Sequence, residues 1–148
     1  MDLELPLDFK EFLKLLNAQK AEYLLIGGYA VGYYGYPRAT ADIDIWIAID
    51  PQNAAKVVAV LKEFGFDVPG LSTELFLKED QIIRMGIPPL RIEVTTTISG
   101  VTFDECYAER QTAMLDDVEV NLISLKHLKI NKKASGRYKD LNDLENLP

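Results

Sequence analysis

The chain has 148 residues, about the size of one domain, and can bury a core without disulfides. Its apolar fraction of 48% is that of a globular protein, and no apolar stretch is long enough to cross a bilayer. The formal net charge of −7 argues against bulk DNA binding, because an acidic body repels a long polyanion. The one cysteine, Cys106, fits a reducing compartment. We therefore expect a cytoplasmic protein with one domain over residues 1–148 and no membrane partner.

Helical and strand patterns alternate in the first half of the chain. Pro6, followed by Asp8 and Glu11, predicts a capping box at the start of the first helix. A later helix opens at Pro51 and closes before Gly65. We expect helices over 7–20, 29–34 and 51–64, and strands over 23–26 and 42–49.

The second half of the chain mixes strands and helices in the same way. We expect strands over 81–85, 90–96 and 118–122, and helices over 103–110, 124–134 and 141–147. Residues 86–89 join the first two of these strands, and Ser124 caps the helix that follows it. Mixed elements with short connections predict an α+β fold in which a mixed β-sheet packs against helices.

Two aspartates occupy alternate positions of one predicted strand. Asp42 and Asp44 share a face, together with Trp46, while Ile43 and Ile45 point to the other face. Two neighbouring carboxylates raise each other's pKa and are costly to bury unless a cation binds them. Mg²⁺ fits such a pair, because it takes one or two carboxylates and fills its other positions with water and phosphate oxygens.

The pair has two alternative interpretations. A calcium-binding loop needs a glycine where Ile47 stands, so it is excluded. A surface strand with two solvated aspartates is the simpler alternative. Gly27 and Gly28, which follow an apolar strand and precede a helix, favour the functional interpretation, because glycine lets a phosphate approach backbone amides at a helix start.

The order strand, Gly27-Gly28, helix, then a strand with Asp42 and Asp44 resembles the nucleotidyltransferase superfamily that includes DNA polymerase beta. The resemblance implies a nucleotidyltransferase fold in which the glycines hold a triphosphate and the aspartates bind metal. It also implies a third carboxylate on a neighbouring strand, and Glu93 matches, although family members more often have Asp there. The alternative for Glu93 is a structural ion pair with Arg84 or Arg91.

A basic segment lies near the carboxyl end. Residues 126–139 carry six Lys and Arg and no acid, a pattern that also suits a solvated helix face. The segment from Asn131 to Leu144 is similar to the closing motif of minimal nucleotidyltransferases of the AbiEii toxin type. That resemblance implies a nucleotide site with these cations, oriented by Asp140: Lys132, Arg137, Lys139 and, from the Arg-Thr-x-Asp pattern, Arg38.

Taken together, the sequence predicts an enzyme that transfers a nucleoside monophosphate from an NTP to a hydroxyl or phosphate, with Mg²⁺ or Mn²⁺ as cofactor. Asp42, Asp44 and Glu93 would bind the metal and act in catalysis. The acceptor is RNA, protein or a small molecule, and the protein could be a toxin–antitoxin component. The alternative is a catalytically silent module that binds nucleotide or acts through protein contacts like an antitoxin.

Overall fold

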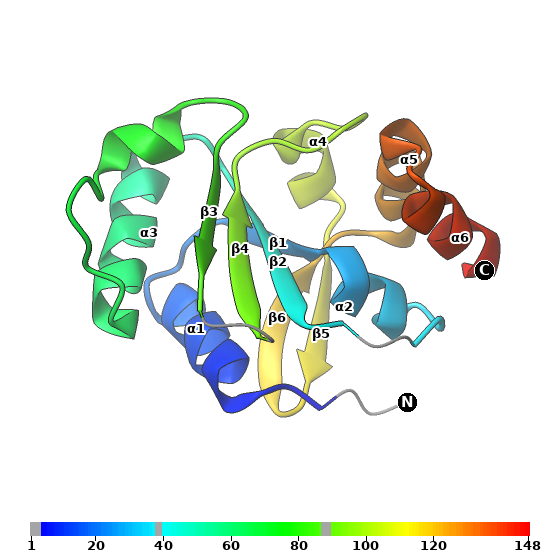
Figure 1. Cartoon of the computed structure of the whole chain (residues 1–148), viewed down its shortest axis with the longest axis horizontal. Helices are drawn as coiled ribbons and strands as arrows, with labels where there is room; N and C mark the ends of the chain where they lie inside the picture. The colour runs from blue at the N-terminus through cyan, green and yellow to red at the C-terminus, as the bar shows by residue number, and fades with distance from the viewer. Residues whose placement is uncertain (1–3, 38–39, 87–89) are drawn as a thin grey trace.

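A six-stranded mixed sheet forms the centre of the computed structural model, which describes residues 4–37, 40–86 and 90–148 (Figure 1). The strand order is β3-β4-β2-β1-β6-β5. The pairs β2–β4 and β1–β6 are parallel, and the other three pairs are antiparallel. The strands are β1 (Tyr23–Ile26), β2 (Asp42–Ile47), β3 (Ile82–Met85), β4 (Arg91–Thr95), β5 (Gln111–Leu115) and β6 (Val118–Leu122). The predicted α+β class with a mixed sheet is confirmed.

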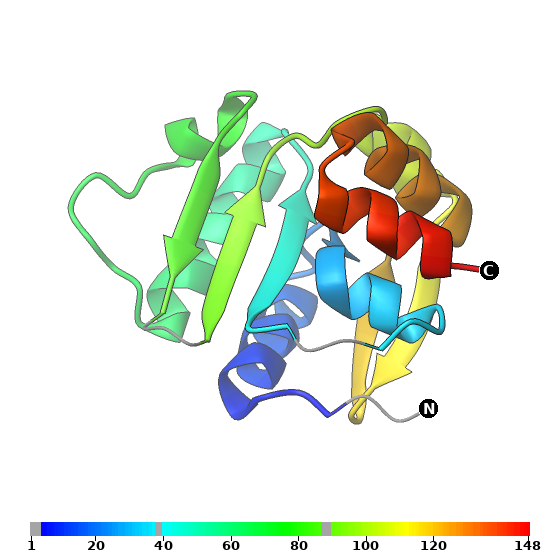
Figure 2. The ribbon, with the colours of Figure 1, turned by 45° about the vertical axis from the view of Figure 1, so that its right-hand side comes forward.

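Helices cover both faces of this sheet. They are α1 (Leu7–Ala18), α2 (Gly27–Tyr33), α3 (Pro51–Phe64), α4 (Phe103–Ala108), α5 (Leu125–Ser135) and α6 (Tyr138–Asn146), with a short 3-10 helix, η1 (Thr73–Leu77). Helices α1 and α3 pack on one face, and α2, α5 and α6 lie on the other (Figure 2). None of the described helices has the length and apolar character needed to cross a bilayer.

The helix boundaries differ from the predicted ones in instructive ways. The capping box at Asp8 was wrong, because α1 already begins after Pro6 and Asp8 lies inside its first turn, with no side-chain cap. Helix α6 begins at Tyr138, three residues before the predicted start, because Arg137 and Asp140 form a reciprocal cap. The caps at Ser124 and Gly65 are present as predicted.

Strand β5 and η1 were not predicted. A hairpin joins β5 to β6 through Asp116 and Asp117, whose φ angles are 48° and 66°. Positive φ at both central residues is typical of a type I′ hairpin turn, whose usual signal is a glycine, which is absent here. Aspartate tolerates this conformation, and the Asp116 carboxylate also accepts a hydrogen bond from the Leu5 amide at 2.9 Å.

Candidate active site

Three carboxylates from two neighbouring strands line one cavity of about 500 Å³. The parallel register of β2 and β4 places Asp44 beside Glu93 and Asp42 beside Arg91. Ile43 and Ile45 are fully buried on the opposite face of β2, which turns the intervening aspartates toward the cavity. We call Asp42, Asp44 and Glu93 the carboxylate wall. Its members share a cavity, as their alternation in the sequence predicts.

The pKa values of Asp44 and Glu93 are shifted in opposite directions. Burial raises the pKa of Asp44 to about 7, and the hydrogen bond to Glu93 and the charges of Glu93 and Asp42 act in the same direction. Burial also acts to raise the pKa of Glu93, but the hydrogen bonds from Arg84 and Asp44 outweigh it and the pKa lies below its usual value. This contact therefore favours the protonated form of Asp44 and the ionised form of Glu93.

Arginines on β3 and β4 pair with two members of the carboxylate wall. Arg84 Nε lies 2.8 Å from Glu93 Oε1, so the ion pair considered as the alternative for Glu93 is present. Arg91 Nε lies 3.3 Å from Asp42 Oδ1. Within residues 4–37, 40–86 and 90–148, no three His, Cys, Asp or Glu side chains are already arranged to hold a metal ion. A cation at this wall would thus compete with the arginines.

The glycine pair brings the backbone against the carboxylates. Gly27 has φ of +70°, and a Cβ built at this position would overlap the carboxylate of Asp44. A Cβ on Gly28 would lie 3.0 Å from the Oγ1 of Thr40. Only glycine therefore fits at position 27, where the corner between β1 and α2 lies directly beside Asp44.

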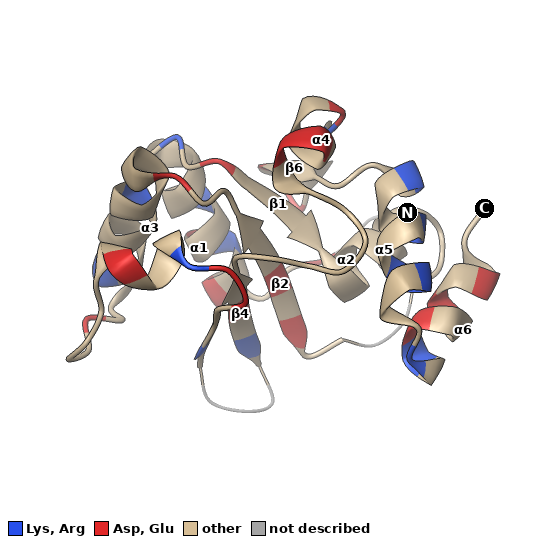
Figure 3. Ribbon diagram, turned by 90° about the horizontal axis from the view of Figure 1, so that it is seen from above, with Lys and Arg blue, Asp and Glu red and all other residues tan. Residues whose placement is uncertain are grey.

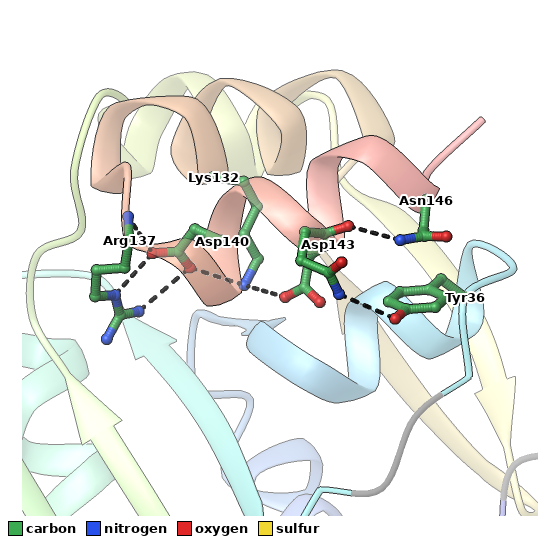
Figure 4. A network of polar contacts seen from close by, with 7 residues as sticks. Tyr36, Lys132, Arg137, Asp140, Asp143 and Asn146 are labelled. Carbon is green, nitrogen blue, oxygen red and sulfur yellow. Dashed lines mark hydrogen bonds and ion pairs between the residues drawn. The ribbon is translucent and has the colours of Figure 1, made fainter.

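Positive side chains from the carboxyl-terminal helices face the carboxylate wall across the cavity. Lys132 on α5, Arg137 before α6 and Lys139 in its first turn all line the cavity, and we call them the cationic wall. Figure 3 shows blue bands along α5 and near the start of α6, across from red bands on β2. The ammonium of Lys132 lies between the buried carboxylates of Asp140 and Asp143 (Figure 4). Arg38, the remaining predicted cation, lies outside the described residues.

Several polar residues of the cavity were not identified from the sequence as part of a site. They lie in the segment after β4 and along α5: Thr97, Ser99, Asn131 and Ser135. The segment after β4 was identifiable, because side chains that follow a strand carrying a functional carboxylate lie at the same edge of the sheet. Asn131 and Ser135 had a weaker signal, their spacing of one helical turn on α5.

Trp46 does not line this cavity, although it alternates with the two aspartates. Its side chain is buried and its Nε1 donates a hydrogen bond to the carbonyl of Thr96 at 3.0 Å. It contributes to a second cavity of about 460 Å³, which shares Thr97 and Ile98 with the first one. The charged residues of this second cavity are Glu79 and Asp104, both acidic.

Comparison with known proteins identifies the family and supports the fold. The model of the aminoglycoside-2''-adenylyltransferase family matches residues 8–147. A candidate nucleotidyltransferase from Thermotoga maritima has a similar structure, with a TM-score of 0.63, 18% identity, and coverage of 93% of this chain and 88% of that one. An antigenic nucleotidyltransferase-like protein from Paracoccidioides brasiliensis has a TM-score of 0.54, 21% identity, and coverage of 92% and 71%. No curated protein matches. At these identities the two structures show that the fold is that of nucleotidyltransferases.

Proposed function

Because this chain belongs to the aminoglycoside-2''-adenylyltransferase family, we propose that it is a metal-dependent enzyme that transfers a nucleoside monophosphate from an NTP to an acceptor hydroxyl. The observation that carries the proposal is the cavity in which a carboxylate wall faces a cationic wall. A nucleoside triphosphate with a divalent cation needs this combination, because oxygen ligands hold the metal while positive groups hold the phosphates. The family description names adenylyl transfer, so ATP is the first NTP to test.

The donor set of the carboxylate wall suits Mg²⁺ or Mn²⁺. All three groups are oxygen ligands, and because the pKa of Asp44 is raised to about 7, a bound cation would displace its proton into solvent near neutral pH. Asp42, Asp44 and Glu93 would hold the ion. When bound, it would neutralise phosphate charge and lower the pKa of the attacking hydroxyl.

The remaining residues would orient the substrate. Gly27 and Gly28 leave space for the triphosphate beside Asp44, and the positive charges of Arg137 and Lys139 face the same space. Either Arg137 or Lys139 would stabilise the negative charge that develops on the leaving pyrophosphate. Lys132 lines the same wall, but its ammonium already has two carboxylate partners.

The acceptor would approach from the β3–β4 side of the cavity. Ile82 and Arg84 on β3 line this side, and the second cavity adjoins it through Thr97 and Ile98. The acidic residues Glu79 and Asp104 would attract a cationic small molecule, as the family description suggests, more readily than RNA. The toxin–antitoxin role is a further hypothesis, which rests on the resemblance of residues 131–144 to AbiEii-type toxins.

The catalytically silent alternative has one observation in its favour, namely that two of the three carboxylates are paired with arginines. One experiment separates the two functions. The protein is incubated with each α-labelled NTP and Mg²⁺ or Mn²⁺, in parallel with an aminoglycoside, total RNA or cell protein. Metal-dependent label on any acceptor supports the enzyme. NTP binding without transfer to any of these acceptors supports the silent module.

A further inference from the structure

Four charged side chains form a network where α5 meets α6 (Figure 4). Lys132 is 4% exposed, and Asp140 and Asp143 are each 1% exposed. Lys132 Nζ lies 3.3 Å from Asp140 Oδ1 and 3.0 Å from Asp143 Oδ2. Arg137 adds a second positive charge beside Asp140, so the four groups carry no net charge.

The position of Lys132 ties its ammonium to these partners. A lysine ammonium has three donors, and two of them are directed to buried carboxylates. If the ammonium moved to a phosphate, both carboxylates would lose their buried counter-ion, which is strongly unfavourable. The ammonium of Lys132 is therefore not available to bind a phosphate directly.

Asp140 links this buried lysine to an exposed arginine. Its Oδ2 accepts from Arg137 Nε at 2.7 Å and from the Arg137 backbone N–H at 3.3 Å, and its Oδ1 accepts from Nη2 at 3.3 Å. The side chain of Arg137 is nevertheless 70% exposed and lines the cavity. Two of the five guanidinium N–H donors are directed to Asp140, so three remain for a ligand.

Arg137 also interacts electrostatically with the carboxylate wall. The pKa of Arg137 lies above its usual value, mainly because of the hydrogen bond to Asp140, and the charges of Asp44 and Glu93 contribute in the same direction. Arg137 lines the same cavity as the carboxylate wall, where the phosphates of an NTP would lie.

We propose that Lys132 is a positioning residue, which fixes Asp140 so that Asp140 presents the guanidinium of Arg137 to the triphosphate. This rests on the nucleotide-binding part of the proposed function. Arg137 makes the contact with the anion, and Lys132 makes none. The ligand class is a triphosphate anion, independent of the base and of the acceptor.

A double-mutant cycle on triphosphate affinity tests this assignment. The probe is inorganic tripolyphosphate with Mg²⁺, measured by calorimetry on the full chain as wild type, Lys132→Met, Arg137→Ala and the double variant. Arg137→Ala is expected to weaken binding by about 10- to 100-fold, the range for a charge-assisted contact. Lys132→Met is expected to weaken it about tenfold, and the double variant no more than Arg137→Ala alone, because both act through one guanidinium.

Two results would overturn the proposal. Losses that multiply in the double variant would mean that Lys132 contacts the anion directly. A lowered melting temperature with affinity within about twofold of wild type would mean that Lys132 supports the fold alone. Lys126→Met is the matched control, because Lys126 is on the same helix with its side chain 68% exposed.

A charge-balanced variant keeps the test decisive if Lys132→Met does not fold. Lys132→Met combined with Asp143→Asn removes one buried cation and one buried anion, and leaves Asp140 with Arg137. It should fold and show the same tenfold loss, and unchanged affinity in it would refute the positioning role. The proposed function fails separately: if wild type binds tripolyphosphate through Arg137 but transfers no label, the transferase assignment is wrong and the role of Lys132 stands.

Discussion

In the cationic wall of the cavity, buried charges lie beside opposite ones. Lys132 contacts Asp140 and Asp143, and Asp140 also contacts Arg137. In the carboxylate wall, Asp44 lies beside Glu93 and Asp42, and the part of the chain that the structure describes offers it no ion pair. Folding alone favours the first arrangement. The second is costly without a cation, and such local conflicts are typical of positions that serve a ligand.

Removal of Lys132 should produce the largest loss of stability. Lys132→Met leaves two buried carboxylates without their shared counter-ion, so the free energy of unfolding should fall by about 3–5 kcal/mol. Urea unfolding measures this loss. Lys126→Met, at an exposed position of α5, should change stability by less than about 0.5 kcal/mol. Equal losses in the two variants would mean that the buried network does not contribute to the free energy of unfolding.

Neutralising Asp44, unlike removing Lys132, should preserve stability but abolish label transfer. Asp44→Asn removes the acid that lacks compensation, so the metal-free protein should be at least as stable as wild type at pH 8. Label transfer should fall by at least about a hundredfold, as when one preorganised group of an active site is lost. The stabilisation by Mg²⁺ should disappear. Asp67→Asn, at an exposed loop position, serves as the control. A melting shift with Mg²⁺ that persists in Asp44→Asn would show that the ion binds elsewhere.

A methyl group at position 27 should distort the carboxylate wall. Gly27→Ala places a Cβ in the space of the Asp44 carboxylate, and the φ of +70° alone costs about 1–2 kcal/mol for a residue with a side chain. Gly70→Ala is a matched control, because Gly70 has φ of +89° and nothing within 4 Å of the added Cβ. Thermal unfolding should show a larger loss for Gly27→Ala, and only this variant should lose its response to Mg²⁺. Equal losses would reduce the role of Gly27 to backbone conformation.

Asp44 should make the free energy of unfolding depend on pH. The pKa of Asp44 is about 7 in the folded protein and about 4 in the unfolded chain, so the folded state holds an extra proton between these values. Stability from this group is complete below about pH 4 and is lost as the pH rises through 7, by at most about 1.4 kcal/mol per pH unit. Urea unfolding of wild type and Asp44→Asn without metal should differ by this slope between about pH 5 and 7. Parallel profiles would place the proton on another group.

The central part of the fold could be predicted from local patterns. The alternation of Asp42, Ile43, Asp44 and Ile45 defines β2 and its buried face, and Gly27 marks the end of β1. Strand β5 could not be predicted in this way, because its exposed residues give little alternation and its hairpin turn lacks a glycine. Pairing with β6, which is a tertiary effect, stabilises it.

The composition of the site was predictable, but the pairing within it was not. Alternation indicated that Asp42 and Asp44 share a face, and the family resemblance implied Glu93, Lys132, Arg137 and Lys139, all of which line the cavity. Neither could indicate that Lys132 lies between Asp140 and Asp143, because this depends on how α6 packs against α5. The spacing also could not decide between metal binding and an ion pair for Glu93. The side chain lines the cavity and contacts Arg84 as well.

Arg84 should give the smallest effect on stability and the most informative one on metal binding. Its side chain is 57% exposed, so the pair with Glu93 contributes at most about 1 kcal/mol, and Arg84→Gln should unfold close to wild type. The same change frees Glu93 from a competing cation, so the affinity for Mg²⁺ should rise by up to about tenfold. Titration calorimetry with Mg²⁺ alone measures this, and Lys62→Gln on α3, at an exposed position, should leave it unchanged. If the affinity falls instead, Arg84 orients Glu93 for the ion rather than competing with it. Asp44 would then be the one carboxylate of this wall whose charge is left uncompensated among the described residues.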